Sequence, residues 1–385
     1  MPAGKISKIG IIGTGFIGNG LLKTLHLFPD MEISAVLTRR NLNDFPEQSY
    51  YTNSLQELID KSELVVECNG DPVYATGLVS KILEAGIPVV TMDAELHITA
   101  GSYLSQKGIF TEAEGDQPGT LAALQRDLVT MGFVPLVYGN LKGFLNYYPT
   151  PEEMHYWAEV QGISLEQVTG FTDGTKVQIE QVLVANGLGA VIAQKGMYGY
   201  LSEDVEEGSK RLAERAKEIG KPISDFLLND PKAKKKFPAG VFITAEYADN
   251  QARALKYLKL GEGPFYTLIR NYHLCHLEIP KTIHQVLNGN GVLLDNSQKP
   301  TASVCVIAKK ELEPGTLLRR IDRNFLIRGE AIAIKEAPQH VPIGLMSNVR
   351  IKRHVESGQM LTFDDVEIGD TPALEGWKYT LSLAN

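Results

Sequence analysis

The feature that most constrains the fold is the motif Gly13-x-Gly15-x-x-Gly18, which lies between an apolar run and a stretch with helical periodicity. Residues 8–12 are typical of a strand and residues 16–28 of a helix. In a strand–turn–helix unit, the first glycine permits the tight turn, the second lets the backbone approach a pyrophosphate, and the third lets the helix pack closely. The free amides of the helix N-terminus would then bind phosphate. The motif therefore predicts a dinucleotide-binding Rossmann unit.

The pattern of alternating strands and helices continues through the first third of the chain. Further strands are expected at residues 32–37, 64–67 and 88–92, and further helices at residues 54–60 and 74–85. This alternation favours a parallel sheet with helices on both faces. We predict an α/β fold with a doubly wound Rossmann domain over residues 1–138.

The pattern loosens from about residue 139. Helical segments at 206–219 and 280–287 are mixed with strand-like runs at 241–245 and 265–270. We predict an α+β substrate and catalytic domain over residues 139–293, whose helix near 280–288 can return to the Rossmann domain. Residues 294–303 are polar and lack periodicity, which is typical of a linker.

A weak internal repeat follows the linker. Residues 310–318 and 353–361 share the order basic, any, apolar, Glu, any, Gly, any, any, Leu, with an offset of 43 positions. Gly315 and Gly358 are expected in tight turns with positive φ. Chance could also produce so loose a pattern. We interpret the repeat as real, and it predicts a small β domain over residues 301–385.

Composition excludes several classes of protein. The net charge of −8 argues against a general nucleic-acid binder, which would need a basic face. Cys68, Cys275 and Cys305 show neither zinc nor disulfide spacing, which favours a reducing compartment. There is no apolar run of 18 residues, and residues 1–4 do not resemble the start of a signal peptide. We expect a cytoplasmic protein without membrane segments.

The end of the second strand discriminates between coenzymes. An acidic residue there would bind the ribose 2′-hydroxyl of NAD, but the chain has Thr38, Arg39 and Arg40. Paired guanidinium donors suit a 2′-phosphate, so NADP(H) is preferred over NAD, although the two arginines could also be solvated loop residues. The residues predicted to bind the coenzyme are Gly13, Thr14, Gly15, Phe16, Ile17, Gly18, Thr38, Arg39, Arg40, Asn69 and Gly70.

Two short segments could contact a substrate. The segment 112–119 (EAEGDQPG) carries three carboxylates between turn residues, as an ordinary loop also could. Lys142 lies in a turn before a glycine, where its ammonium group could reach a substrate, but a solitary lysine is more often solvated. The predicted substrate-binding residues are Glu114, Asp116, Gln117 and Thr175.

The segment around residues 172–180 offers a stronger combination. In a helix that begins near Thr172, the side chains of Asp173, Lys176 and Glu180 lie on one face. Two carboxylates and an ammonium group could transfer protons or hold a metal. A strand would separate them, and a surface ion pair is the simpler interpretation.

A second polar cluster contains Arg270, His273, His276 and Glu278. Histidine titrates near neutral pH and arginine can bind a phosphate or carboxylate. The two histidines could also bind a metal, but no third ligand has matching spacing. The predicted catalytic residues are Lys142, Asp173, Lys176, Glu180, Arg270, His273 and His276, with no metal ligands assigned.

Together these segments resemble the homoserine-dehydrogenase-like oxidoreductases with a C-terminal SAF domain, above all the deoxyxylulose-phosphate reductoisomerase-like enzymes. The resemblance covers nearly the whole chain. It rests on the internal repeat and on the segments 13–20 (GTGFIGNG), 114–119 (EGDQPG), 171–176 (FTDGTK) and 263–280 (GPFYTLIRNYHLCHLEIP). It implies a Rossmann domain, an inserted catalytic and oligomerising α+β domain, and a small β-clip at the end.

The resemblance also implies an activity. Asp173 and Lys176 look like counterparts of the family's second catalytic Asp and Lys. Homoserine dehydrogenases place a lysine after the strand that here ends near Thr91, but residues 92–95 (MDAE) contain none, which argues against homoserine oxidation. The reductoisomerase-like branch would rearrange a phosphorylated ketose and reduce the product with NADPH, aided by Mg²⁺ or Mn²⁺.

The leading hypothesis is therefore an NAD(P)H-dependent oxidoreductase that acts on a small phosphorylated or polyhydroxylated carbonyl compound, as a homo-oligomer. The alternative within the same class is a simple dehydrogenase of a polyol, a sugar acid or a homoserine-like substrate. A hypothesis from another class is a non-catalytic dinucleotide sensor or scaffold.

Overall fold

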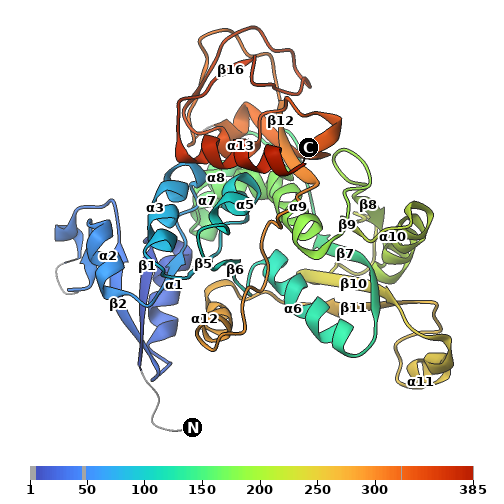
Figure 1. The fold of residues 1–385 in the computed structure, drawn as a ribbon. Helices are drawn as coiled ribbons and strands as arrows, with labels where there is room; N and C mark the ends of the chain where they lie inside the picture. Colours follow the sequence, from blue (N-terminus) through green and yellow to red (C-terminus); the bar gives the residue numbers. More distant parts are fainter. Residues whose placement is uncertain (1–5, 46–48, 322, 385) are drawn as a thin grey trace.

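The computed structural model describes residues 6–45, 49–321 and 323–384. These residues form three parts: a Rossmann part, a middle part and a C-terminal part that lies across both (Figure 1). Residues 1–4, whose sequence was interpreted above, lie outside the described ranges.

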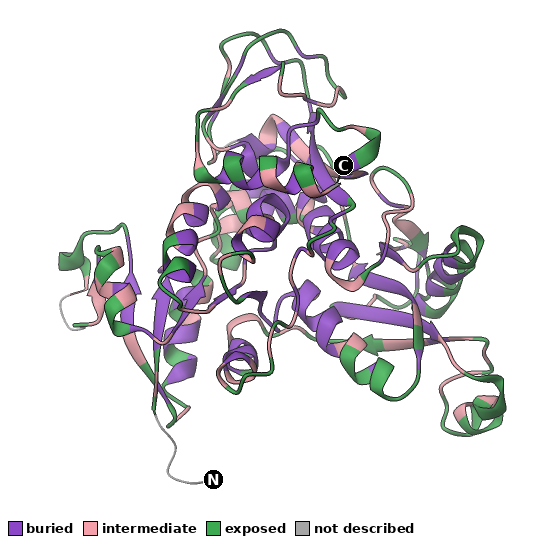
Figure 2. Ribbon diagram, viewed as in Figure 1, coloured by how far each residue is buried: buried purple, intermediate pink, exposed green. Residues whose placement is uncertain are grey.

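The Rossmann part is built on a six-stranded parallel sheet in the order β3-β2-β1-β4-β5-β6. This order and the parallel pairing confirm the predicted doubly wound α/β fold. The apolar runs that predicted strands are fully or largely buried, as the purple strands in Figure 2 show. The strands are β1 (Ser7–Ile12), β2 (Met31–Leu37), β3 (Tyr51–Thr52), β4 (Leu64–Glu67), β5 (Val89–Thr91) and β6 (Phe110–Glu112).

Helices cover both faces of this sheet. On one face, Ile9 and Ile11 pack against α1 (Phe16–Leu25) and α12 (Ile279–Leu287). α12 therefore packs on the Rossmann sheet although it follows the middle part in the chain. The other face carries α2 (Leu55–Lys61), α3 (Pro72–Glu84) and a continuous helical stretch made of α4 (Ala94–Leu96), the π-helical η2 (His97–Gly101) and α5 (Ser102–Leu104).

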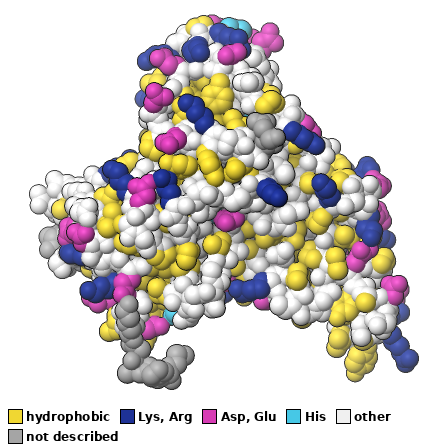
Figure 3. All heavy atoms as spheres, in the orientation of Figure 1, with side chains coloured by type: hydrophobic (Ala, Val, Ile, Leu, Met, Phe, Trp, Pro, Cys, Tyr) yellow, Lys and Arg dark blue, Asp and Glu magenta, His cyan; other side chains and the backbone are white. Residues whose placement is uncertain are grey.

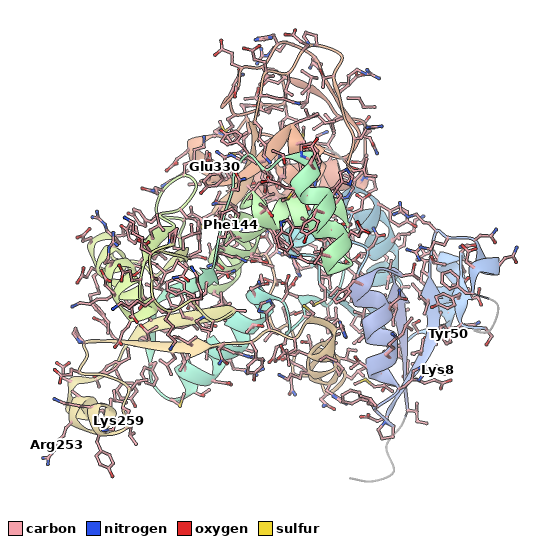
Figure 4. The ribbon with its side chains drawn as sticks, turned by 180° about the vertical axis from the view of Figure 1, so that it is seen from behind. Lys8, Tyr50, Phe144, Arg253, Lys259 and Glu330 are labelled. Atoms are coloured by element: carbon pink, nitrogen blue, oxygen red, sulfur yellow. The ribbon has the colours of Figure 1, made fainter. Side chains whose placement is uncertain are left out.

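The middle part contains a mixed five-stranded sheet in the order β11-β10-β7-β9-β8. One face packs against α6 (Gln117–Thr130) and α9 (Thr175–Leu188), and the other against α10 (Val205–Ile219). Arg253 and Lys259, at the distal α11 (Ala252–Tyr257), lie far from Lys8 and Tyr50 of the Rossmann part (Figure 4). The strands are β7 (Val134–Lys142), β8 (Tyr200–Ser202), β9 (Ile223–Asn229), β10 (Gly240–Glu246) and β11 (Phe265–Arg270).

The predicted boundary after residue 138 falls inside β7, all of which belongs to the middle sheet. Two helices, α7 (Pro151–Gln161) and α8 (Leu165–Thr172), follow β7 as a hairpin, and each begins with a capping box. Phe144, at the start of the connection to this hairpin, lies near the junction with the C-terminal part (Figure 4). The Arg328 guanidinium, 5.0 Å from the centre of the Tyr147 ring, connects the same segment to that part.

The C-terminal part combines two small antiparallel sheets with a final helix. One sheet pairs β12 (Ala302–Ala308) with β14 (Ile327–Ala333), and the other has the order β13 (Leu317–Leu318), β15 (Val349–Ile351), β16 (Val366–Glu367). The helix α13 (Pro372–Ala384) packs against α3, α5 and η2 of the Rossmann part.

The two copies of the internal repeat face each other. Leu312 and Val355, which occupy equivalent positions, exchange backbone hydrogen bonds of 2.9 and 3.0 Å. Gly315 N donates to Ile351 O, and Gly358 N donates to Ala308 O, both at 2.8 Å. Both glycines have positive φ (89° and 83°), as predicted. The repeat is thus a local pseudo-twofold arrangement, whereas the assignment of residues 301–385 as a SAF-like domain stays a prediction.

The surface carries both signs of charge. Lys and Arg side chains are interspersed with Asp and Glu on the face shown in Figure 3. Cys68, Cys275 and Cys305 are all free thiols. None of the helices in the described ranges combines the length and the apolar character that a bilayer crossing requires.

Candidate active site

The glycine turn between β1 and α1 has the geometry that its sequence predicts. Gly13 has φ +106°, and a Cβ there would lie 2.8 Å from the Cys68 carbonyl oxygen. A Cβ on Gly18 would clash with the Gly13 carbonyl oxygen, so the third glycine allows α1 to start close to the turn. A Cβ on Gly15 would meet no atom within 4 Å, which leaves open space where a pyrophosphate would approach.

A cavity of about 210 Å³ lies beside this turn. The Arg39 guanidinium lies 4.5 Å from the centre of the Tyr74 ring, and the Thr38 hydroxyl accepts a hydrogen bond from Arg40 N at 3.2 Å. The Asn69 Nδ2 atom is buried and has no hydrogen-bond partner in the described part of the chain. The cavity is lined by Ile12, Gly13, Thr14, Gly15, Leu37, Thr38, Arg39, Arg40, Cys68, Asn69 and Tyr74.

These observations fit a bound dinucleotide, because one cavity is lined by the open glycine turn, by the basic residues after β2 and by the unpaired amide of Asn69. Seven residues predicted to bind the coenzyme line the cavity, whereas Ile17 packs against the core and Phe16 is exposed on the other side of the turn. Sequence reasoning missed Tyr74. Its aromatic ring two residues after the start of α3 gave no signal of its own, because only the folded chain brings it to Arg39.

A lysine and two carboxylates meet beside the carboxyl edge of the Rossmann sheet. Lys176 Nζ lies 2.9 Å from Asp116 Oδ2 and 3.6 Å from Glu180 Oε1. Glu180 also accepts a hydrogen bond from Asn140 Nδ2 at 2.8 Å and lies 3.4 Å from Lys142 Nζ. Four of the predicted site residues, Asp116, Lys142, Lys176 and Glu180, are therefore brought together, although the sequence placed them in three separate segments.

Three elements position this group. Asp116 precedes the first turn of α6, Lys142 ends β7, and Lys176 and Glu180 lie one turn apart on α9. The amide nitrogen of Gln117 faces the carboxylates of Asp116 and Glu180 and donates a hydrogen bond to each. The Lys176 side chain is 25 % exposed, so its ammonium group is accessible to a ligand, while that of Glu180 is only 1 % exposed.

The charges in this group reinforce one another. Burial alone would lower the pKa of Lys176, but the carboxylates of Asp116 and Glu180 outweigh it and raise the pKa above its usual range. Burial would likewise raise the pKa of Asp116, but the charge and hydrogen bond of Lys176 lower it, with a smaller contribution from His273. Lys176 is therefore an ammonium group at neutral pH, which can donate a hydrogen bond to a ligand and can protonate a strongly basic oxygen such as an alkoxide.

Buried acids extend from this group along the carboxyl edge of the sheet. Glu67, Thr91 and Glu112 occupy one register row across β4, β5 and β6, and none of them is exposed. Thr91 Oγ1 donates to Glu67 at 2.6 Å. Burial, followed by the charge of Asp93, raises the pKa of Glu67 to about 8. Burial, followed by the charge of Asp116, also raises the pKa of Glu112 well above its usual value, so burial disfavours the charged form of both side chains.

The raised pKa of Glu67 predicts a pH-dependent stability. Its pKa is about 8 in the fold and near 4.5 when unfolded, so the fold loses stability as pH rises from 4.5 to 8. Glu67→Gln keeps the acceptor for Asn69 N but cannot ionise. As pH rises from 5 to 9, the free energy of unfolding of this variant should increase relative to that of the natural protein by on the order of 2–4 kcal/mol. Unfolding measured across this range tests it, and a pH-independent difference would contradict it.

Asp173 and Thr175 do not belong to the Lys176 group. Asp173 lies between α8 and Gly174 (φ +81°), and this turn directs its carboxylate to Lys309 Nζ, 2.6 Å away in the C-terminal part. Thr175 Oγ1 accepts a hydrogen bond from Gly329 N at 2.9 Å. The expectation that Asp173 shares a helix face with Lys176 and Glu180 is therefore wrong, because α9 begins only at Thr175.

The residues Glu114 and Arg270 form a second ionic cluster. Arg270 pairs with Glu114 at 2.8 Å and with Glu278, and Lys281 lies 2.8 Å from each of these carboxylates. A cavity of about 780 Å³ between α6 and α12 opens beside this cluster. The ion pairs of Glu114 and Arg270 in the described part of the chain are thus made within this second cluster and not with Lys176 or Glu180.

The two predicted histidines separate. His273 lies near Asp116, where its charge helps to lower the pKa of that carboxyl group. His276 instead packs on α1: its ring centre is 5.7 Å from that of Phe16, and a Cβ on Gly20 would lie 2.5 Å from its ring. The sequence spacing predicted one cluster, but the turn at Cys275 (φ +48°) sends the histidines to different elements.

The divalent cation implied by the resemblance has no matching ligand set. Across residues 6–45, 49–321 and 323–384, no three His, Cys, Asp or Glu side chains are arranged to hold a metal ion. Asp116 and Glu180 are both paired with Lys176. We therefore assign no step to a metal.

Comparison with known families decides the class of protein. Residues 13–106 match the family model described as homoserine dehydrogenase, NAD binding domain, and residues 115–279 match the one described as oxidoreductase DRL, catalytic domain. The chain is an NAD(P)-dependent oxidoreductase. These matches confirm the expected type of coenzyme-binding domain and the expected reaction class.

Other comparisons add little. No curated protein matches the chain. Among solved structures, homoserine dehydrogenase from S. aureus is 13% identical, with 87% of this chain and 94% of that chain covered and a TM-score of 0.40. Dihydrodipicolinate reductase from Paenisporosarcina sp. TG-14 is 14% identical, with 74% and 97% covered and a TM-score of 0.37. Similarity at this level says nothing about the substrate.

Proposed function

We propose that the protein uses NADPH to reduce a small, hydroxyl-rich carbonyl compound, with Lys176 as the proton donor. The observation that carries the proposal is the position of Lys176. Its ammonium group is held between Asp116 and Glu180 beside the carboxyl edge of the Rossmann sheet, where a bound substrate would meet the nicotinamide. The coenzyme, when bound, supplies the hydride.

Each residue of the group has a role that follows from its contacts. Lys176 hydrogen-bonds the substrate carbonyl oxygen and gives it a proton as negative charge develops there. Asp116 and Glu180 fix the position of Lys176 and keep it charged. Lys142 and the buried Asn140 hold Glu180 from the opposite side, which leaves the Lys142 ammonium near the substrate hydroxyl groups.

The site favours simple hydride transfer over a transfer that follows rearrangement of the carbon skeleton. The cations in the Lys176 group are already paired with carboxylates, which suits hydroxyl and carbonyl groups better than a phosphate. The rearrangement would rely on a divalent cation, for which the described residues offer no three-ligand set. An unphosphorylated, hydroxyl-rich carbonyl compound, whose reduced form is a polyol or a hydroxylated sugar acid, is therefore the substrate class that we propose.

The preference for NADP(H) rests on Arg39 and Arg40 at the end of β2. Arg40→Ala should weaken NADPH binding about 10- to 100-fold, because a guanidinium–phosphate hydrogen bond contributes roughly 1.5–3 kcal/mol. NADH lacks the 2′-phosphate, so the Kd for NADH should be the same in the variant and in the natural protein. NADH binding is therefore the internal control. Fluorescence titration of both coenzymes measures the effect. Equal losses for the two coenzymes would contradict a role in phosphate recognition.

A substrate screen tests the proposed reaction. The purified protein is assayed by absorbance at the reduced nicotinamide band, in both directions, with sugars, sugar acids, polyols and their phosphate esters, each with and without Mg²⁺ or Mn²⁺. We expect turnover of an unphosphorylated carbonyl compound without added metal. Turnover restricted to a ketose phosphate plus metal would support the rearranging activity instead, and NADPH binding without any turnover would support a sensor.

A further inference from the structure

An arginine of the C-terminal part reaches the coenzyme side of the Rossmann part. The Arg320 Nη2 atom donates a hydrogen bond to the carbonyl oxygen of Gly70, in the loop that joins β4 to α3. This contact spans 250 positions of sequence. It is therefore a tertiary contact that ties a loop after β4 to a separate part of the fold.

Arg320 belongs to an ionic group in which all three parts of the protein meet. Its guanidinium lies 2.9 Å from Glu166 of α8, 3.8 Å from Asp71 and 3.9 Å from Glu95. Arg323 pairs with Glu95 at 2.8 Å and donates to two backbone carbonyls of its own part, so it anchors the group there. The Arg320 side chain is 17 % exposed, and such partly buried, multiply paired charges are held in a defined geometry.

The loop that Arg320 holds also lines the candidate coenzyme cavity. Asn69 lies immediately before Gly70, and its backbone N–H donates to Glu67 at 2.6 Å. Gly70 has φ +72°, so the chain turns sharply at this point. The backbone on both sides of the Asn69 side chain is thus held, by Glu67 at its own N–H and by Arg320 at the next carbonyl, while the buried Nδ2 atom of Asn69 has no partner in the described part of the chain.

We propose that Arg320 is a positioning residue for coenzyme binding, through which the C-terminal part sets the orientation of Asn69. The inference rests on the coenzyme site of the proposed function. Arg320 itself does not touch the cavity, whose lining does not include it. It holds the Gly70 carbonyl so that the preceding amide side chain faces the dinucleotide. Because linkage is reciprocal, coenzyme binding then also tightens the docking of the C-terminal part.

The test uses three variants of the full chain. Arg320→Met removes the donor and keeps an apolar stem, and Arg320→Lys keeps the charge but loses the forked geometry. Arg350→Met is the matched control, because Arg350 donates at 2.8 Å to the carbonyl of Gly315 within the C-terminal part, away from the coenzyme loop. Folding of each variant is checked by near-ultraviolet circular dichroism.

Two readouts are measured for each variant: the Kd for NADPH by fluorescence titration, and amide hydrogen exchange of residues 68–74 without coenzyme. We expect Arg320→Met to raise the Kd about tenfold and to accelerate exchange in this loop, with Arg320→Lys intermediate and Arg350→Met unchanged. Folded Arg320 variants with unchanged Kd and exchange would overturn the inference.

The same measurements separate this inference from the proposed function. If the natural protein does not bind NADPH, the proposed coenzyme site fails and the inference fails with it. If the natural protein binds NADPH and the Arg320 variants bind it equally well, only the inference fails. Faster exchange in the loop with an unchanged Kd also overturns it, because Arg320 would then support the loop without affecting the coenzyme.

Discussion

Lys176→Met is expected to lower kcat about 1,000-fold with the substrate that the screen identifies. The variant removes the proton donor and one positive charge from the point where the carbonyl oxygen becomes negative. Each effect alone commonly contributes about two to three powers of ten, and the two are not additive because one side chain supplies both. The coenzyme cavity lies outside the Lys176 group, so the Kd for NADPH should change less than twofold. Single-turnover kinetics with saturating NADPH isolates the hydride-transfer step.

A matched lysine controls for the loss of charge. Lys195 pairs with Glu330 at 3.2 Å on the surface, so Lys195→Met removes an ion-paired lysine without touching the candidate site, and its kcat should stay unchanged. Lys176→Arg keeps the charge but not the pKa or the shape of the donor, and it should recover only a small part of the rate. If kcat of the Lys176→Met variant stayed within tenfold of the natural value, the assignment of Lys176 as proton donor would be wrong.

Lys309→Met is expected to lower the free energy of unfolding by about 3–5 kcal/mol, because it leaves the carboxylate of Asp173 buried without a counter-charge. The side chains of Asp173 and Lys309 are only 0 % and 4 % exposed, and their charged atoms are 2.6 Å apart. Denaturant-induced unfolding followed by circular dichroism measures the loss. A decrease below 1 kcal/mol would show that the pair does not hold the middle and C-terminal parts together.

A double variant tests the origin of this loss. Asp173→Asn removes the charge and keeps the Oδ1 atom that accepts from Thr175 N at 2.9 Å. If the unpaired charge causes the destabilisation, Lys309→Met combined with Asp173→Asn should be more stable than Lys309→Met alone. The combined variant should also retain catalysis, because Asp173 lies outside the Lys176 group. A large loss of kcat at unchanged stability would restore Asp173 to the catalytic residues.

The local parts of the fold could be predicted from the sequence. The segments 64–67 and 265–270 are strands at the predicted residues, because both are short runs rich in β-branched, aromatic and apolar side chains. Residues 64–67 are buried throughout, whereas 265–270 form an edge strand that is only partly buried. The positive φ of Gly315 and Gly358 could be predicted because tight turns favour glycine in this backbone conformation. Four of the six parallel strands were predicted from the alternation of strands and helices, whereas the short β3 and β6 were not.

The candidate site could be predicted only in part, since sequence spacing reports neighbours along one element. Lys176 and Glu180 were recognised as a pair because they lie one helical turn apart. Asp173 was misplaced because a glycine with φ +81° separates α8 from α9 and reverses the direction of its side chain. Its partner, Lys309, is 136 positions away, and no periodicity in the sequence connects the two.

The packing of α12 has a consequence for how the Rossmann part can be isolated. Ile279, Ile283 and Val286 cover the sheet face formed by Ile9 and Ile11, although they follow the whole middle part in the chain. The Rossmann part is therefore discontinuous in sequence. The chain leaves it after β6, forms the middle part and returns to the Rossmann part with α12. A fragment cut after β6 would expose the apolar surface that α12 shields, and would tend to aggregate. A Rossmann part that folds by itself needs residues 279–287 joined to it by a short artificial linker.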